Sequence, residues 1–154
     1  MAGIFSRSKN QAGPKVGARR SVQRERFGAY FPRLFAYCFA ATGDEKSAQD
    51  AVATAFAGVF TLPDMREEDF EIELFRAARQ FSREQGHAHY TDGLNSRERE
   101  VISLLFDAQL NRDQVSEILN IREETVVNTL LRGLRKLRPE DVKASAGNPV
   151  ASLS

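Results

Sequence analysis

The sequence predicts an all-α protein, and two observations lead to that fold class. Apolar residues recur at helical spacing over residues 21–84 and again over 94–138. Residues that cap helix N-termini, such as Asp44, Asn95 and Asn111, stand where these periodic stretches begin. The chain of 154 residues suits either one domain of ordinary size or two small helical ones.

Residues 1–20 contain glycine, proline, serine and basic side chains without an apolar period. We expect a disordered basic arm here, which acts either as a solvated tail or as a weak electrostatic contact to nucleic acid. No apolar run approaches the ~18 residues that suggest a membrane span. The sequence therefore predicts no membrane association.

Two helices are predicted next, joined at Thr42–Asp44. Gly43 suits the end of the first helix and Asp44 the cap of the second. Pro32 is expected to be tolerated as a bend in the first helix. The two predicted inner faces contain Phe27, Tyr30, Phe31, Leu34, Phe35 and Cys38 in the first helix, and Ala48, Ala51, Val52, Ala55, Phe56 and Val59 in the second. On these residues alone the pair is a plain helical hairpin.

Three further helices are predicted between residues 94 and 138. The first begins after Asn95, with Glu98 completing a capping box, and the second begins after Asn111, with Gln114 in the equivalent place. Asn120 tolerates the left-handed backbone of a sharp turn. The predicted inner faces are Val101, Ile102 and Leu105, then Val115, Ile118 and Leu119, and then Val126, Leu130 and Leu137 of a helix from about 123 to 137.

A short helix, a tight turn and a longer helix form the arrangement that places one helix in the major groove of DNA. The same pattern also suits an ordinary helical hairpin without a nucleic-acid role. The formal net charge is only +1, so any DNA binding must come from local patches. Cys38 is the only cysteine, which excludes an internal disulfide and favours a buried core residue in a reducing cytoplasm.

The run L-x-x-R-E-R-E-V, the later T-V and the basic R-K-L resemble region 4 of bacterial sigma factors. The C-terminal DNA-binding domain of the LuxR type is also similar. The N-terminal half separates the two, because F-x-x-Y-F-P-R-L-F-A-Y, G-D and A-x-D-x-V-x-x-x-F-x-x-V-F resemble region 2 of the extracytoplasmic-function sigma factors. This resemblance implies a region 2-like bundle over 21–84, a short linker over 85–93, a region 4-like helix-turn-helix domain over 94–138 and a flexible tail over 139–154.

The resemblance also implies partners and contact residues. The expected partners are core RNA polymerase, promoter DNA and an anti-sigma or other regulatory protein. Polymerase contacts are expected at Asp50, Ala53, Thr54 and Phe56. DNA contacts are expected at Arg76, Arg79, Gln80, Thr125, Asn128, Thr129, Arg132, Arg135 and Lys136.

Several positions depart from the family pattern. Ala53 and Thr54 follow Asp50 where the family usually has glutamine and glutamate, and Glu73 stands where a tryptophan is usual. The place of the promoter-melting loop carries four carboxylates, which repel phosphate: Asp64, Glu67, Glu68 and Asp69. The predicted recognition helix carries an apolar line of Val127, Leu131 and Leu134, which more often marks a protein contact than a DNA surface.

No catalytic pattern appears in the sequence, so we expect a protein that is not an enzyme and that needs no cofactor. His87 and His89 have no cysteine nearby and are interpreted as loop residues rather than metal ligands. The leading hypothesis is a cytoplasmic bacterial transcription-initiation protein. The alternative is a sigma-like regulatory module that binds proteins and has lost most of its promoter binding.

Overall fold

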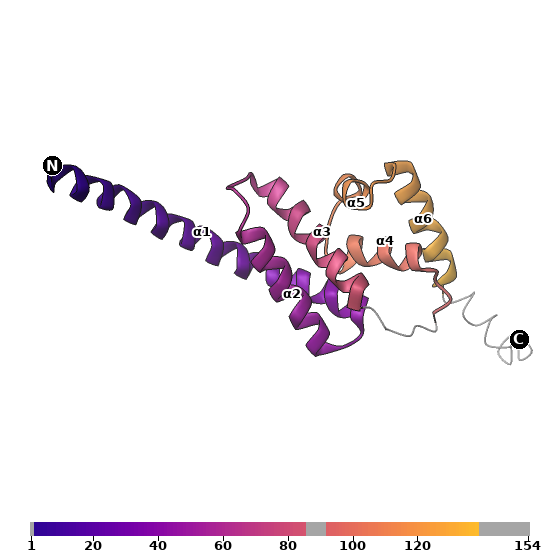
Figure 1. Ribbon diagram of the computed structural model, residues 1–154. Helices are drawn as coiled ribbons and strands as arrows, with labels where there is room; N and C mark the ends of the chain where they lie inside the picture. The colour runs from indigo at the N-terminus through magenta and orange to yellow at the C-terminus, as the bar shows by residue number, and fades with distance from the viewer. Residues whose placement is uncertain (1, 86–91, 139–154) are drawn as a thin grey trace, which may run out of the picture. The chain divides into compact units, whose positions relative to one another are not determined.

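The computed structural model describes the backbone of residues 2–85 and 92–138, and their side chains from residue 17 onward. Those ranges contain helices and no strand, so the predicted all-α fold class is confirmed (Figure 1). The helices are α1 (Ala2–Thr42), α2 (Glu45–Phe60), α3 (Glu67–Gln85), α4 (Ser96–Phe106), α5 (Arg112–Leu119) and α6 (Glu123–Lys136). By its contacts the chain divides into two compact units, Met1–Pro32 and Arg33–Ser154.

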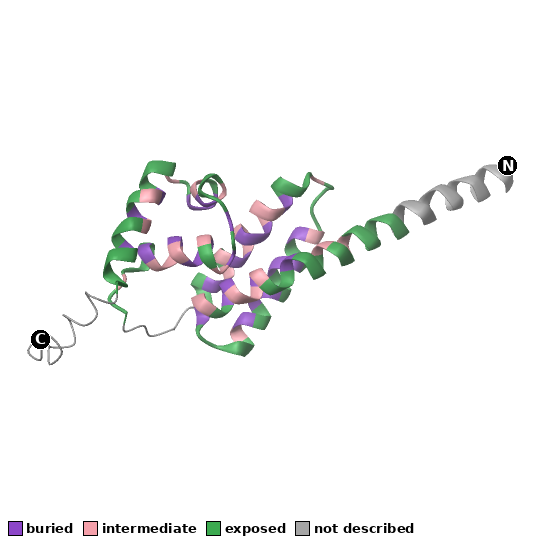
Figure 2. Cartoon of the chain, turned by 180° about the vertical axis from the view of Figure 1, so that it is seen from behind, coloured by how far each residue is buried: buried purple, intermediate pink, exposed green. Residues whose placement is uncertain are grey.

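Helix α1 starts earlier than the sequence pattern suggests. Its backbone is helical from Ala2, through the segment 2–20 for which we expected disorder. Periodicity gives no signal here, whereas Arg, Gln and Glu, frequent around residues 18–26, have good intrinsic helix propensity. Figure 2 shows exposed residues along the described N-terminal part of this helix, and Arg19, Arg20 and Arg24 are among them.

The connection between α1 and α2 has the predicted chemistry. Gly43 adopts a positive φ of 72°, which a residue without a Cβ accepts readily. The Asp44 carboxylate accepts a hydrogen bond from the Ser47 backbone N–H at 2.8 Å and so caps α2. Thr42 is buried, and its hydroxyl donates to the Cys38 carbonyl at 2.8 Å. The predicted boundary at Thr42–Asp44 is therefore confirmed.

The inner face of α2 is the one predicted, since all six of its expected residues are buried. Helices α2 and α3 pack side by side (Figure 1), and the Phe56, Phe60 and Phe70 rings stack in sequence with centroids 5.5 and 5.9 Å apart. Helix α3 buries an apolar face of its own, made of Phe70, Leu74, Phe75 and Ala78.

The aromatic face of α1 is only partly as predicted. Tyr30, Leu34 and Cys38 are buried, but Phe27 and Phe31 are 45% and 37% exposed. Tyr37 is buried instead, because it follows Leu34 by three residues and shares its side of the helix. Burial raises the pKa of Cys38 to about 11, so this thiol stays protonated, as expected for a core residue.

Some predictions lie outside the described residues. They concern His87, His89, most of the linker 85–93 and the tail 139–154. Within the described ranges, no helix combines the length and the apolar character that crossing a membrane requires. The same ranges contain no cluster of three His, Cys, Asp or Glu side chains that could hold a metal ion.

Candidate nucleic-acid interface

Helices α4 and α5 begin at the capping boxes that the sequence predicts. The Asn95 side chain accepts from the Glu98 N–H at 2.8 Å, while the Glu98 carboxylate accepts from the Asn95 N–H at 2.9 Å. Asn111 and Gln114 form the same reciprocal pair at 2.8 and 2.9 Å. Each box satisfies two backbone donors that a helix N-terminus otherwise leaves without partners. The starts of both helices are therefore fixed locally.

The turn between α5 and α6 is closed by a left-handed residue. Asn120 has φ 54° and ψ 49°, and the backbone N–H of the next residue, Ile121, donates to the Ser116 carbonyl at 3.0 Å. This geometry ends α5 sharply and lets α6 start at Glu123. Helix α6 contacts both α5 and α4 (Figure 1), so the predicted helix-turn-helix arrangement is present.

The inner face of α6 differs from the predicted one. Val126, Thr129 and Gly133 are buried, whereas Leu137 is 39% exposed. A Cβ on Gly133 would lie 2.8 Å from the Ile102 side chain, so the glycine allows α6 to approach α4 closely. Thr129 is only 2% exposed and therefore cannot present its hydroxyl to DNA in this arrangement. We leave Thr129 out of the candidate interface.

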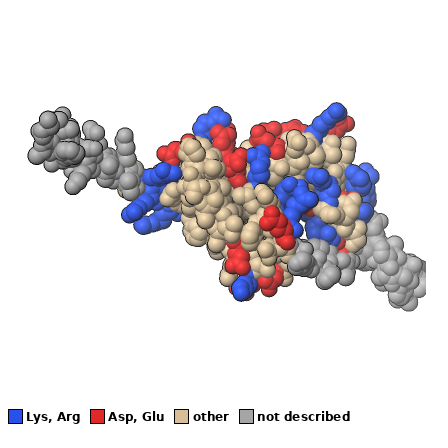
Figure 3. Space-filling view, in the orientation of Figure 1, with Lys and Arg blue, Asp and Glu red and all other residues tan. Residues whose placement is uncertain are grey.

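The outer face of α6 carries the remaining polar candidates of the recognition helix. Thr125, Asn128, Arg132 and Arg135 are all exposed. Figure 3 shows Lys and Arg side chains gathered over the part of the molecule that contains α4–α6. Glu123 and Glu124 are exposed in the first turn of the same helix, where they suit the helix dipole but repel phosphate. The face that could meet DNA is therefore of mixed charge.

An apolar strip runs beside this polar face. Leu131 and Leu134 are 46% and 38% exposed, and Val127 is half-buried. Residues 127, 131 and 134 follow the spacing of one side of a helix. We call these three residues the α6 apolar strip, and their placement matches the predicted one.

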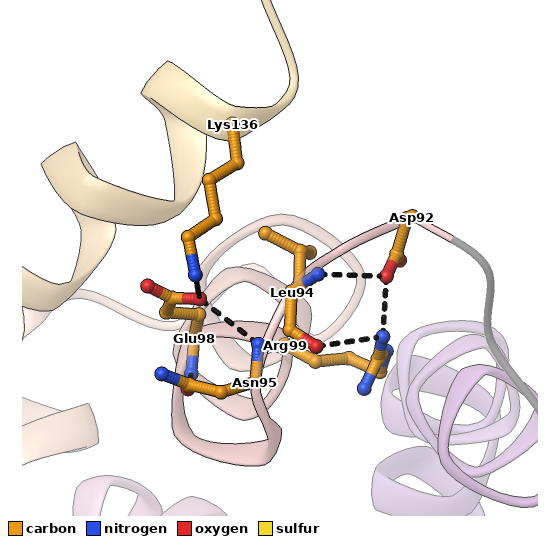
Figure 4. A network of polar contacts seen from close by, with 6 residues as sticks. All are labelled: Asp92, Leu94, Asn95, Glu98, Arg99 and Lys136. Carbon is orange, nitrogen blue, oxygen red and sulfur yellow. Dashed lines mark hydrogen bonds and ion pairs between the residues drawn. The ribbon is translucent and has the colours of Figure 1, made fainter. Parts of the chain in front are cut away.

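Lys136 forms an ion pair within the chain. Its ammonium group donates to Glu98 Oε1 at 2.7 Å, and the Glu98 side chain is fully buried. Figure 4 shows this pair beside a second group of contacts, in which Arg99 pairs with Asp92 and donates to the Leu94 carbonyl at 3.3 Å. Lys136 was predicted to contact DNA, and in this structure its charge instead holds the end of α6 to the start of α4.

The surroundings of Glu98 favour its charged form. The hydrogen bond from Lys136, together with the backbone N–H of Asn95, lowers the pKa of Glu98 from its ordinary value of 4.5. One carboxylate thus has two tasks, because it caps α4 and also pairs with α6. The capping role was readable from the sequence, whereas the pairing with a residue 38 positions away was not.

The predicted DNA-binding arginines of α3 are also paired within the chain. Arg79 forms an ion pair with Glu100 of α4, and both side chains are 18% exposed. Arg76 pairs with Glu73 and donates to the Glu117 carbonyl of α5 at 3.4 Å. Gln80 is exposed. Sequence reasoning missed the role of Glu100, for which no local pattern gives a signal.

Arg33 is a second connecting residue that the sequence did not indicate. It donates to the Glu71 carboxylate and to the Ala108 carbonyl, both at 3.0 Å. Its guanidinium also lies over the Phe75 ring, 5.9 Å from the centroid. These contacts, together with the packing of α3 on α5, join the helices before residue 86 to those after residue 91.

The predicted polymerase-binding residues fall into two groups. Asp50, Ala53 and Thr54 are exposed and share one side of α2. Phe56 is only 3% exposed and packs against Phe60, so its predicted contact with a partner is wrong for this arrangement. Phe56 belongs to the core because it lies on the inner face of α2.

A comparison with known families matches residues 92–139 to the model of sigma-70, region 4. The matched segment contains α4, α5 and α6. No curated protein matches the chain. This part of the chain is therefore similar to sigma-70 region 4, which confirms the sigma resemblance at that level.

Proposed function

We propose that this protein is a sigma-like transcription-initiation factor that binds core RNA polymerase and promoter DNA in the bacterial cytoplasm. The observation that carries the proposal is the sigma-70 region 4 match over a helix-turn-helix whose second helix has an exposed polar face. A role of this kind is non-enzymatic, and it needs only binding surfaces. Two surfaces of the chain support it.

The first surface is the outer face of α6. The Asn128 amide can form a bidentate pair with the N6 and N7 edge of adenine in the major groove. Arg132 and Arg135, exposed on the same helix, suit contacts to the phosphate backbone, which fix the position of the helix. Thr125 adds a hydroxyl near the end of the helix that would enter the groove.

The arginines of α3 can contact DNA only if they leave their carboxylate partners within the chain. Arg79 is held by Glu100 and Arg76 by Glu73, so a phosphate must replace a carboxylate before either arginine contacts DNA. Gln80 is exposed and needs no such exchange. We therefore assign the primary DNA contact to α6 and a secondary one to α3.

The second surface is the exposed side of α2 that carries Asp50, Ala53 and Thr54. In the sigma factors that this half resembles, the corresponding helix binds the polymerase. Asp50 supplies a carboxylate there, while Ala53 and Thr54 supply a small, nearly neutral surface. We propose that Asp50 is the main polar contact of this face.

A pull-down of core RNA polymerase with the full chain, followed by run-off transcription on genomic fragments, tests the proposal. We expect stable binding and discrete transcripts. Asp50→Arg should abolish both without loss of helix content, because the residue is exposed. Glu45→Arg is the matched control, since it makes the same change of charge at an exposed residue about 140° away from Asp50 around the same helix. Absence of polymerase binding by the unaltered protein would contradict the proposal.

A second candidate function is a regulatory module that binds another protein through the α6 apolar strip. The observation in its favour is the exposure of Leu131 and Leu134 beside a polar face that lacks the predicted Lys136 and Thr129 contacts. If this candidate is right, Leu131→Asp weakens the binding free energy of the protein complex by several kcal/mol, because a charge is buried in an apolar interface. If α6 instead binds DNA, the same change acts through phosphate repulsion, which added salt partly masks.

A further inference from the structure

A cavity beside the proposed interface lies between the C-terminal part of α1, α3 and α4. Its volume is about 350 Å³, within the range of ~300–1,000 Å³ typical of small-molecule sites. All the lining residues belong to the unit Arg33–Ser154. No sequence pattern indicates this cavity, because its walls come from three separate helices.

The lining is strongly cationic. Four guanidinium groups, those of Arg79, Arg83, Arg97 and Arg99, surround the cavity against a single lining carboxylate, that of Glu100. Guanidinium groups bind phosphate and carboxylate through two parallel hydrogen bonds, which suits an anion with several oxygens. Such a concentration of like charge is favourable only when an anion lies among the groups or when water screens them.

Two of these arginines are already paired and two are not. Arg79 pairs with Glu100, and Arg99 pairs with Asp92. Arg83 and Arg97 are exposed at the cavity and form no ion pair with another described residue. Their charge is therefore available to a ligand without breaking a bond within the chain.

The first turn of α4 contributes backbone donors to the same cavity. Ser96 and Arg97 line it, and they are the first two residues of a helix of 11 residues. The N–H groups at these positions have no partner inside the helix, and the helix dipole favours an anion there. The Asn95 side chain caps the N–H of Glu98, so it leaves these two donors for a ligand.

A buried hydroxyl on the opposite wall gives an independent indication of a ligand. Ser82 lines the cavity and is only 2% exposed, yet its Oγ forms no hydrogen bond with a described nitrogen or oxygen. A side-chain hydrogen bond with Ser82 lowers the pKa of the Cys38 thiol, so this hydroxyl has a sulfur partner, which binds it only weakly. A buried hydroxyl in this state is satisfied when a ligand oxygen reaches it.

We propose that this cavity binds a small phosphorylated anion of the diphosphate type. Arg83 and Arg97 hold the phosphate oxygens, the N-terminal N–H groups of α4 bind from one end, and the Ser82 hydroxyl binds from the wall. A polyvalent anion suits the site better than a monovalent one, since the lining carries three more positive than negative groups. Because Glu100 also lines the cavity, the bound anion competes with it for Arg79.

Calorimetric titration of the full chain with sodium pyrophosphate, at constant ionic strength, tests the site. We expect saturable binding of one pyrophosphate per chain, with orthophosphate binding more weakly. Arg83→Gln combined with Arg97→Gln should weaken binding by about a hundredfold or more, since it removes two charged hydrogen-bond donors. Ser82→Ala should weaken it several-fold.

The controls distinguish specific binding in the cavity from nonspecific electrostatic attraction to surface arginines. Arg112→Gln removes an exposed arginine that does not line the cavity, and it should leave pyrophosphate binding unchanged. Circular dichroism checks that each variant keeps its helix content. Binding that is absent at millimolar pyrophosphate, or that falls equally in Arg112→Gln, would overturn the proposal.

A parallel measurement of DNA binding distinguishes a small phosphorylated ligand from the phosphate backbone of DNA. If the ligand is a small anion, the double variant of Arg83 and Arg97 loses pyrophosphate binding but keeps its affinity for duplex DNA. If pyrophosphate displaces DNA and the double variant loses DNA affinity, these arginines serve the DNA backbone and the small-ligand site is refuted. If the unaltered protein does not bind DNA at all, the proposed DNA-binding function is contradicted. The calorimetric result with pyrophosphate still decides whether the cavity binds a small anion.

Discussion

Lys136 Nζ lies 2.7 Å from Glu98 Oε1 and joins the last residue of α6 to the first turn of α4. The lysine is 41% exposed, whereas the glutamate is fully buried, so the charge that this contact neutralises lies inside the domain. The same carboxylate caps α4 through the Asn95 N–H. A residue of the proposed DNA-binding helix therefore stabilises the helix-turn-helix domain.

The first prediction follows from this pair. Lys136→Met should lower the melting temperature, because it leaves a buried carboxylate without its cation. Arg135→Met is the matched control, since Arg135 is exposed on the outer face, and it should leave the melting temperature nearly unchanged. Thermal unfolding followed by circular dichroism measures both. Equal melting temperatures for the two variants would show that the pair contributes nothing to stability.

The second prediction concerns acid. Because the folded-state pKa of Glu98 is lowered from 4.5, its contribution to stability is present above about pH 4.5 and is lost as the pH falls through the folded-state pKa. Urea unfolding between pH 7 and pH 3 should show this loss in the natural protein. Glu98→Gln keeps a capping side chain but has no charge to titrate, so its free energy of unfolding should depend less on pH. If the free energy of unfolding depended on pH equally in the natural protein and in Glu98→Gln, the loss of stability in acid would not come from Glu98.

The third prediction tests the close approach of α6 to α4. Gly133→Ala should gain less stability than helix propensity alone would give, because the new Cβ would lie 2.8 Å from Ile102 Cδ1 and the end of that side chain must turn away. Gly58→Ala is the control, since a Cβ there meets nothing within 4 Å. It should stabilise the protein by up to about 1 kcal/mol through helix propensity. Urea unfolding should therefore show a smaller gain in the free energy of unfolding for Gly133→Ala than for Gly58→Ala.

The fourth prediction concerns the ion pair between α3 and α4. A double-mutant cycle with Arg79→Gln and Glu100→Gln should give a coupling free energy of ~0.5–3 kcal/mol, because both side chains are largely buried. The comparison cycle uses Arg66 and Asp69, whose side chains are 78% and 50% exposed, and its coupling should be close to zero. If the Arg79 cycle also gave no coupling, this pair would not hold the two helices together.

The fifth prediction concerns DNA binding by α6. If Arg132 and Arg135 contact phosphates, replacing each by alanine should reduce the slope of log affinity against log salt by about 0.9. Lys46→Ala removes an exposed cation from α2 and should leave the slope unchanged. Fluorescence anisotropy with labelled duplex DNA at several salt concentrations measures the slopes. A slope that neither arginine changes would remove α6 from the DNA contact and favour the protein-binding candidate.

Much of the fold was readable from the sequence because its signals are local. A cap at Asp44, Asn95 or Asn111 forms hydrogen bonds to residues three positions away, so the residues needed to recognise it stand together. The inner face of α2 follows from a helical period that one segment contains in full. The helical backbone of residues 2–20 was not expected, because this segment has neither an apolar period nor a capping pattern and contains Gly3, Gly13 and Pro14.

The sequence by itself determined the helix termini, the turn at Asn120 and the inner face of α2, since each depends on neighbours within about one helical turn. Only the tertiary structure decided which charged residues remain available to a partner. Arg79 meets Glu100 and Lys136 meets Glu98 across 21 and 38 positions of chain, and Thr129 is buried where α6 packs. Pairings at such separations depend on how helices pack, because side-chain type alone does not choose between a phosphate outside and a carboxylate inside.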